Sequence, residues 1–208
     1  MIIGLVGYIG SGKGTVGDIL VREHGYYKFA FADALKDAVS QIFVWPRGLL
    51  EGDSNASRAF RERVDPWWSH KFGYEVTPRL ILQKFGTEAC RHGIADNIWI
   101  AALEKRIQGY NDVVISDVRF PNEIAFVRSA GGAIVRVKRG ADPSAEELSK
   151  MHVSETAWND TIPDYCIMNE GTLDDLKNNV KSTLTLEEKR ITIIDRKSTR
   201  LNSVTLES

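Results

Sequence analysis

Short runs of apolar residues alternate with amphipathic segments along most of the chain. Five apolar runs predict buried strands at residues 2–6, 27–31, 112–116, 133–137 and 165–168. The segments between them predict helices at residues 14–24, 33–43, 78–92, 98–109, 122–129 and 173–184. Short apolar strands that alternate with helices are typical of a parallel sheet covered on both faces. The pattern therefore predicts an α/β fold built on a five-stranded parallel sheet.

The longest departure from this alternation is the segment 44–77, which is rich in Pro, Gly and Arg. We interpret it as an insertion on the substrate side of the sheet. Trp67 and Trp68 lie inside it, and they either pack locally under a long loop or form a base-stacking lid surface. The polar, loop-rich segment 138–154 is a candidate second flap.

Composition places the chain among ordinary soluble domains. It has 208 residues, 43% hydrophobic and 26% charged, with a net charge of −1. The length predicts one domain that can bury a hydrophobic core. The near-neutral charge predicts neither nucleic-acid binding nor membrane association. No apolar run approaches about 18 residues, and Met1 leads straight into the first strand, so we expect neither a membrane helix nor a signal peptide. The expected location is the cytoplasm, that of the host for a phage-encoded chain.

The cysteines and histidines indicate no structural metal. Cys90 and Cys166 are far apart and form no CxxC motif, so we expect reduced, partly buried thiols. The four histidines show no metal-ligand spacing.

Residues 7–15 read Gly-Tyr-Ile-Gly-Ser-Gly-Lys-Gly-Thr, directly after the first predicted strand. Glycines let such a loop wrap around phosphate, the following helix adds its positive end, and the lysine supplies a point charge. The alternative is a Gly-rich turn that happens to carry a lysine. The pattern predicts a nucleotide-phosphate site formed by Gly10, Ser11, Gly12, Lys13, Gly14 and Thr15.

The Gly-Lys-Gly-Thr ending resembles the nucleoside monophosphate kinases. Three further segments look like the phage-type deoxynucleoside monophosphate kinases, at residues 79–88, 115–123 and 152–173. With the phosphate loop they span about residues 1–180, and the insertion is poorly covered. The resemblance implies phosphoryl transfer from ATP to a deoxynucleoside monophosphate (dNMP), giving ADP and a dNDP. It also implies a P-loop kinase sheet with strand one between strands three and four.

Phosphoryl transfer depends on positioning and charge neutralisation more than on covalent chemistry. Lys13 and the neighbouring amides are expected to hold the ATP phosphates. Thr15 is expected near Mg²⁺, although the shifted Gly-Thr ending leaves direct ligation open. Asp117, which ends the third strand, is expected to orient Mg²⁺ through water or to accept a proton from the attacking phosphate. Its alternative role is a helix N-cap or a structural ion pair.

Arg119 follows the same strand, and its fork matches phosphate oxygens, so we expect it to bind the acceptor phosphate. Arg139, rather than Arg136 inside the strand, is the expected lid arginine. By resemblance, the acceptor side further includes Asp33, Lys36, Arg79, Gln83 and Thr87, and the adenine turn includes Asn169 and Gly171. Each has an alternative as a solvated helix or plain turn residue.

Other P-loop functions compete with this one. A dephospho-coenzyme A kinase also fits the 169–173 turn, and the segments 79–87 and 117–123 argue against it. A GTP-binding switch would carry Asn-Lys-x-Asp and Asp-x-x-Gly motifs, which do not occur. A motor-type or regulatory ATPase without a small acceptor remains an alternative. The sequence leaves open the accepted base, the choice of deoxyribose or ribose, and whether a homodimer forms.

The end of the chain has a different character. Residues 195–203 are similar to the translation of a common short-read sequencing adapter. We therefore expect a kinase domain over residues 1–190 and a tail over 191–208 that is disordered or carries no selected function. The alternative is an ordinary polar terminus.

Overall fold

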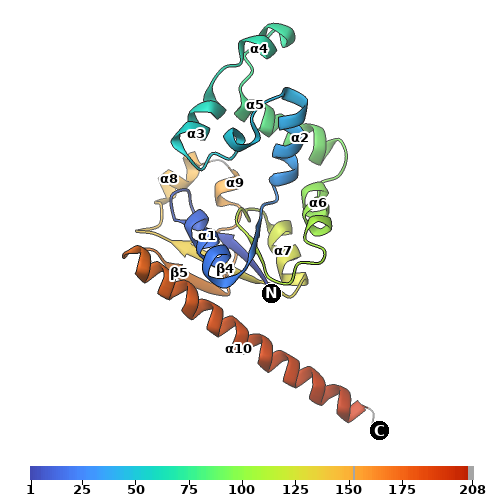
Figure 1. Cartoon of the computed structure of the whole chain (residues 1–208), viewed down its shortest axis with the longest axis vertical. Coiled ribbons are helices and arrows are strands. Elements are labelled where there is room, and N and C mark those ends of the chain that lie inside the picture. The colour runs from blue at the N-terminus through green and yellow to red at the C-terminus, as the bar shows by residue number, and fades with distance from the viewer. Residues whose placement is uncertain (152, 206–208) are drawn as a thin grey trace.

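A parallel sheet forms the centre of the molecule (Figure 1). The computed structural model describes residues 1–151 and 153–205, with side chains placed through residue 151 and from 155 to 192. The strands are β1 (Ile2–Val6), β2 (Tyr27–Phe29), β3 (Val113–Ile115), β4 (Ala133–Lys138) and β5 (Tyr165–Met168). They lie in the order β2-β3-β1-β4-β5, and each neighbouring pair is parallel. The predicted α/β class and the place of strand one between strands three and four are confirmed.

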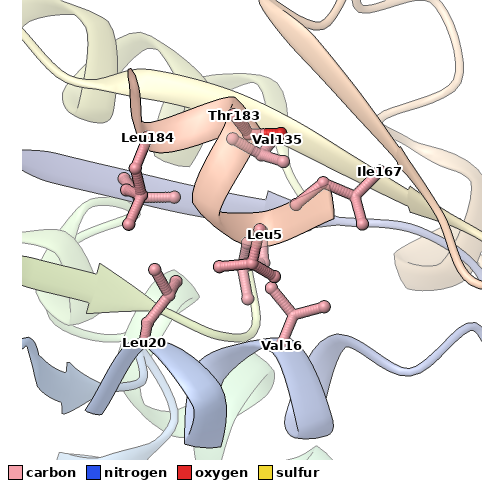
Figure 2. Close-up of a pocket in the computed structure, with 9 residues that line it drawn as sticks. Leu5, Val16, Leu20, Val135, Ile167, Thr183 and Leu184 are labelled. Atoms are coloured by element: carbon pink, nitrogen blue, oxygen red, sulfur yellow. The ribbon is translucent and has the colours of Figure 1, made fainter. Parts of the chain in front are cut away.

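One face of the sheet is covered by α1 (Lys13–His24) and α10 (Leu173–Thr205). Figure 2 shows Leu5 of β1 between Val16 and Leu20 of α1 and the α10 side chain Leu184. The small cavity among them is lined by aliphatic side chains and Thr183. It offers no charged group to a nucleotide, so it belongs to the core and not to a substrate site.

The opposite face is covered by α6 (Ile98–Arg106) and α7 (Pro121–Ser129). Gly4 of β1 faces this side, where an added Cβ would lie 3.0–3.2 Å from Ile134, Val118 and Val127. A glycine in the central strand therefore lets α7 pack close to the sheet. Alternate residues of β1 thus serve two separate cores, as expected for a sheet buried on both faces.

The insertion is largely helical and shares a hydrophobic core with α2 (Asp33–Phe43). It contains η1 (Arg47–Leu50), α3 (Asn55–Glu62) and α4 (Pro66–Phe72), and in Figure 1 α4 lies at the end of the molecule opposite α10. Trp68 packs on Phe43 at 4.7 Å between ring centroids, and its Nε1 donates to the Phe43 carbonyl at 3.1 Å. Trp67 contacts Trp68 edge-on and is 58% exposed. Trp68 therefore packs locally, which is the first of the two interpretations of this pair. Trp67 is the exposed residue of the two.

Two predicted boundaries are corrected by tertiary contacts. β2 ends at Phe29 because the amides of Phe31 and Ala32 bond to Asp117 instead of continuing a strand. The helix predicted at 78–92 divides into α5 (Pro78–Gln83) and the π-helical η2 (Lys84–His92). Trp99 Nε1 donates to the Gly86 carbonyl at 3.0 Å, a bond that uses a backbone acceptor inside η2.

α10 continues well past the predicted end at residue 184. Glu187 is buried, and it accepts hydrogen bonds from the Tyr165 hydroxyl at 2.9 Å and from Arg190 Nε at 2.7 Å. The helix therefore stays docked on β5 beyond Leu184. Its backbone runs on through residues 191–205, where the sequence predicts a tail, and residues 206–208 lie outside the described part.

The candidate flap at 138–154 contains α8 (Ala145–Lys150), which starts at a capping box formed by Ser144 and Glu147. α9 (Val153–Thr156) follows, and residue 152 lies outside the described residues. Both cysteines are free thiols; Cys90 is buried as expected, whereas Cys166 is exposed. In the described part of the chain, no helix is long and apolar enough to cross a membrane.

Candidate phosphate-transfer site

The loop between β1 and α1 can be built only with glycine at two positions. Gly7 has φ +147°, and a Cβ there would lie 2.4 Å from the carbonyl oxygen of Val137. Gly12 has φ +100°, and a Cβ there would lie 2.3 Å from Asn169 Nδ2. The first contact fixes the loop against β4 and the second against the end of β5. Local sequence therefore sets a loop that curls over the carboxyl edge of the sheet, where ligands bind in open α/β folds.

Lys13 is the first residue of α1 and folds back across this loop. Its Nζ donates to the carbonyls of Gly7 at 2.5 Å and Tyr8 at 2.9 Å. Burial lowers the pKa of Lys13 to about 8; the charge of Glu155 opposes this shift most, Arg119 adds to it, and Asp117 also opposes it. The charges of Asp117 and Arg119, two predicted catalytic residues that follow β3, therefore act on Lys13.

The rest of the phosphate loop has the features of an anion site. Ser11 Oγ is buried and has no hydrogen-bond partner among the described residues. Gly10, Gly14 and Thr15 are exposed beside it, at the start of α1. An unsatisfied hydroxyl and the free amides of a helix start are donors that phosphate oxygens can satisfy. This cradle fits the phosphates of a nucleotide.

Asp117 joins two elements of the sheet edge. It lies two residues beyond β3, and its two carboxylate oxygens accept the amides of Phe31 at 2.8 Å and Ala32 at 3.1 Å. Burial raises the pKa of Asp117, while these amides, Lys36 and Arg119 favour the ionised form. Asp117 therefore has a structural role, because it holds the backbone at the start of α2; the N-cap residue of that helix is Ala32. Each oxygen retains a further lone pair for a ligand.

The guanidinium of Arg119 pairs with Glu155 of α9. The backbone of Glu155 is held as well, because Trp158 Nε1 donates to the Glu155 main-chain carbonyl at 2.9 Å. Sequence reasoning did not select Glu155 as a site residue. Glu155 does lie in the segment 152–173 that carries the family resemblance, and this was the sequence signal that could have identified it.

Glu123 was also missed, although it lies in the resemblance segment 115–123. It is buried and accepts the amides of Arg119 at 2.8 Å and Phe120 at 3.1 Å, and its other oxygen pairs with Arg91 at 3.0 Å. Burial and the nearby charge of Asp117 raise the pKa of Glu123 to about 7. Glu123 therefore fixes the backbone of Arg119 to the start of α7 and to η2.

The predicted acceptor residues of α2 are held by the insertion. Asp33 accepts the amide of Ala30 at 2.8 Å and Arg47 Nη2 at 3.1 Å. Lys36 Nζ pairs with Glu51 at 2.6 Å, and Arg47 also pairs with Glu51. These charges form one network between α2 and η1, and Lys36 is near enough to Asp117 to affect its pKa.

The remaining acceptor residues lie on α5 and η2. Arg79 is the second residue of α5 and pairs with Glu62 of α3, and both side chains are about half exposed. Gln83 and Thr87 are exposed and four residues apart across the α5–η2 junction. Among the described residues, neither side chain forms a hydrogen bond or ion pair with Lys13 or Arg119, so their acceptor role stays a prediction.

Arg136 lies in β4 and Arg139 directly follows this strand, and the two side chains have different contacts. Arg139 is exposed and forms no ion pair among the described residues. The guanidinium of Arg136 lies over the rings of Trp158 at 5.2 Å and Tyr8 at 5.9 Å, and it pairs with Asp142 at 2.5 Å. The structure therefore brings Arg136 to the phosphate loop through Tyr8 and leaves Arg139 outside this cluster.

At the end of β5, Asn169 supports the phosphate loop. Its Nδ2 donates to the Ser11 carbonyl at 2.9 Å, which places the side chain directly against Gly12. Gly171 follows in the turn, where a Cβ would lie 2.5 Å from the Asp175 carboxylate. The hydrogen bond from Asn169 to the Ser11 carbonyl supports the phosphate loop, and adenine binding by this turn remains a prediction.

Comparison with known proteins identifies the family. The model of the family described as "Deoxynucleotide monophosphate kinase" matches residues 67–180, more than half of the chain. A protein of Acanthamoeba polyphaga mimivirus named "Putative deoxynucleotide monophosphate kinase" is 35% identical over 154 residues, which cover 67% of this chain and 74% of that protein. The deoxynucleotide monophosphate kinase of Enterobacteria phage T4 is 25% identical over 111 residues, covering 51% of this chain and 44% of the phage protein.

Among solved structures, TT1252 from Thermus thermophilus is similar at a TM-score of 0.48 and 20% identity, covering 89% of this chain and 96% of that one. The assignment rests on the family model and the viral relative, together with the phosphate loop and strand order described above. The chain belongs to the deoxynucleotide monophosphate kinase family.

Proposed function

We propose that this chain transfers the γ-phosphoryl group of ATP to a deoxynucleoside monophosphate, yielding ADP and the corresponding dNDP. The observation that carries the proposal is the phosphate loop, where Lys13 Nζ bonds to the carbonyls of Gly7 and Tyr8 and the buried Ser11 hydroxyl has no partner among the described residues. Family membership supplies the acceptor class. The cytoplasmic location and the kinase domain at residues 1–190 remain parts of this proposal.

In the proposed reaction, an oxygen of the acceptor phosphate bonds to the γ-phosphorus, and the bond from that phosphorus to the β–γ bridging oxygen breaks. Lys13 and the amides of residues 10–15 hold the ATP phosphates and offset the negative charge that builds on the leaving ADP. Arg119 exchanges its contact with Glu155 for the acceptor phosphate, and the fixed backbone next to Glu123 keeps its direction. Proximity of two held phosphates is the main contribution to rate.

The donor set near the loop suits Mg²⁺, which prefers oxygen ligands and usually keeps several waters. The described residues form no group of three His, Cys, Asp or Glu side chains that could hold a metal by itself. Thr15 and Asp117 offer a hydroxyl and a carboxylate, which fits an ion carried by the nucleotide phosphates. Bound there, Mg²⁺ would supply positive charge to those phosphates. Asp117 would orient its waters or accept a proton from the acceptor phosphate.

The decisive experiment is a coupled ADP-release assay with dAMP, dGMP, dCMP, dTMP and their ribose counterparts, alongside dephospho-coenzyme A and a reaction without acceptor. We expect ADP release that depends on a dNMP, and a Lys13→Ala loss of at least about 10²-fold with the fold intact, because the ammonium contacts loop carbonyls and not the core. ADP release without any acceptor would indicate an ATPase, and release only with dephospho-coenzyme A would indicate the rival kinase. A near-normal rate in Lys13→Ala would contradict the assigned phosphate site.

A further inference from the structure

Arg91 of η2 forms a buried ion pair that the proposed reaction does not use. Its Nη2 lies 3.0 Å from Glu123 Oε1, and the two side chains are 15% and 4% exposed. The same guanidinium lies over the Phe120 ring, 4.8 Å from its centroid. Removing two charges from water is costly, and a buried pair adds little net stability over apolar residues of the same size. Stability alone therefore does not account for this pair.

Glu123 does more than close the start of α7. It is the third residue of that helix, and its Oε2 accepts the amide of Phe120, as in a capping box. Glu147 at the third position of α8 makes the same kind of bond to Ser144 and is exposed. The Oε2 of Glu123 also accepts the amide of Arg119, while its Oε1 pairs with Arg91. Arg91 thus orients the carboxylate that holds the Arg119 backbone.

The helix that carries Arg91 is itself held by two neighbouring helices. Trp99 of α6 donates to the Gly86 carbonyl at 3.0 Å, and a Cβ on Gly86 would lie 2.9 Å from Leu35 of α2. Thr87, one of the residues predicted for the acceptor side, lies on the same helix four positions before Arg91. The ion pair therefore connects the predicted acceptor segment to the loop that carries Arg119.

We propose that Arg91 is a positioning residue for the acceptor phosphate, on which it acts through Glu123 and the backbone of Arg119. The inference rests on the proposed function and deepens it, because it gives η2 a part in orienting the arginine that binds the acceptor. The charge of Arg91 lowers the pKa of Glu123, whereas burial and Asp117 raise it. An ionised carboxylate accepts both amides, and the fixed backbone limits the directions open to the Arg119 side chain. A misplacement of about 1 Å can cost about 100-fold in rate.

The first test compares Arg91→Gln with Arg190→Gln in the full chain. Arg190 is a matched control, because it pairs with the buried Glu187 at 2.7 and 2.5 Å on α10, which covers the face of the sheet opposite α7. Each variant leaves a buried carboxylate without its arginine, so both should lower the Tm. Only Arg91→Gln should raise the acceptor KM, by about 3- to 10-fold, and lower kcat, with the ATP KM within about twofold of wild type.

The second test asks whether Arg91 acts through Arg119. In an Arg119→Lys background the fork is already lost, so adding Arg91→Gln should raise the acceptor KM by less than about twofold further. Arg91→Lys keeps the charge beside Glu123 and should raise the acceptor KM by only about two- to threefold. Independent effects of Arg91→Gln and Arg119→Lys, which multiply in the double variant, would overturn the inference.

Two results of the first test would also overturn the inference. One is a folded Arg91→Gln enzyme with a lowered Tm and unchanged acceptor constants, and the other is an equal rise of the acceptor KM in Arg190→Gln. If Arg91→Gln does not fold, Arg91→Lys with a lowered Tm and unchanged acceptor constants is the contradicting result. Wild-type enzyme without dNMP-dependent ADP release would instead contradict the proposed function.

Discussion

The strongest prediction concerns the pH dependence of ATP binding through Lys13. Burial lowers the pKa of this ammonium to about 8 in the nucleotide-free protein. Bound phosphates would give it anionic partners, which favour the charged form and move the pKa back toward its usual range. Above pH 8, Lys13 of the nucleotide-free protein is mostly deprotonated, so ATP binding requires this side chain to take up a proton. ATP affinity must therefore fall as pH rises through 8.

The size of the effect follows from the fraction of free protein that has lost the proton. With a pKa of about 8, the apparent Kd is multiplied by about 1.3 at pH 7.5 and by about 11 at pH 9. The expected change is about eightfold, close to 1.2 kcal/mol. Phosphate groups titrate near pH 6, so ATP keeps a nearly constant charge across this interval. Isothermal titration calorimetry without acceptor, at fixed ionic strength, measures the Kd at both pH values.

Lys13→Arg is the control, because a guanidinium stays charged throughout this range. It should bind ATP more weakly overall, since the longer side chain does not fit the carbonyls of Gly7 and Tyr8, but its Kd should not change with pH. A wild-type Kd that changes by less than about twofold between pH 7.5 and pH 9 would refute the reasoning. So would an equal rise in the arginine variant, which would assign the titration to another group.

Three further predictions test other parts of the molecule. Arg119→Lys keeps the charge but loses the fork, so the acceptor KM should rise and kcat should fall while the ATP KM stays constant in steady-state kinetics; unchanged acceptor constants would remove Arg119 from the acceptor site. The folded-state pKa of Glu123, about 7, exceeds its usual 4.5, so the folded protein binds the extra proton and stability falls between pH 5 and pH 8 by up to about 3 kcal/mol. Denaturant unfolding should show a smaller pH-dependent loss in Glu123→Gln, and an equal loss would contradict the assignment. A chain that ends at residue 192 should keep wild-type activity and Tm, because the proposed kinase domain ends before it; a Tm lower by several degrees would show that the tail contributes to the fold.

Strands and the phosphate loop were predictable because their determinants are local. The apolar runs set β1 and β4 within a residue, and the spacing of glycines around Lys13 specifies a loop without reference to distant segments. The break at η2 was not predictable, because it involves Trp99 bonding to Gly86 and the packing of Gly86 on Leu35. Those contacts exist only once the helices have assembled.

The same distinction explains which site residues were missed. Arg119 and Asp117 follow a buried strand, a position that local sequence identifies. Glu155 is 36 residues away from Arg119 in sequence and reaches it only because α9 packs through Trp158 beside the phosphate loop. Proximity to a strand end favoured Arg139, while the fold places Arg136 over the Tyr8 ring, and the lid role of Arg139 stays a prediction. Sequence position indicates which residues lie at the carboxyl edge of the sheet, and tertiary packing determines which of their side chains face the site.

The pairing of the site's cations leads to one mechanistic consequence. Lys36 is paired with Glu51, Arg79 with Glu62, and Arg119 with Glu155, so three of the predicted phosphate-binding cations already contact a carboxylate. Two of these carboxylates belong to the insertion and the third to α9. A phosphate that enters must share or replace these contacts, which weakens the hold of the insertion and α9 on their present partners. If these cations bind the acceptor phosphate as proposed, acceptor binding is linked to the positions of the insertion and of α9.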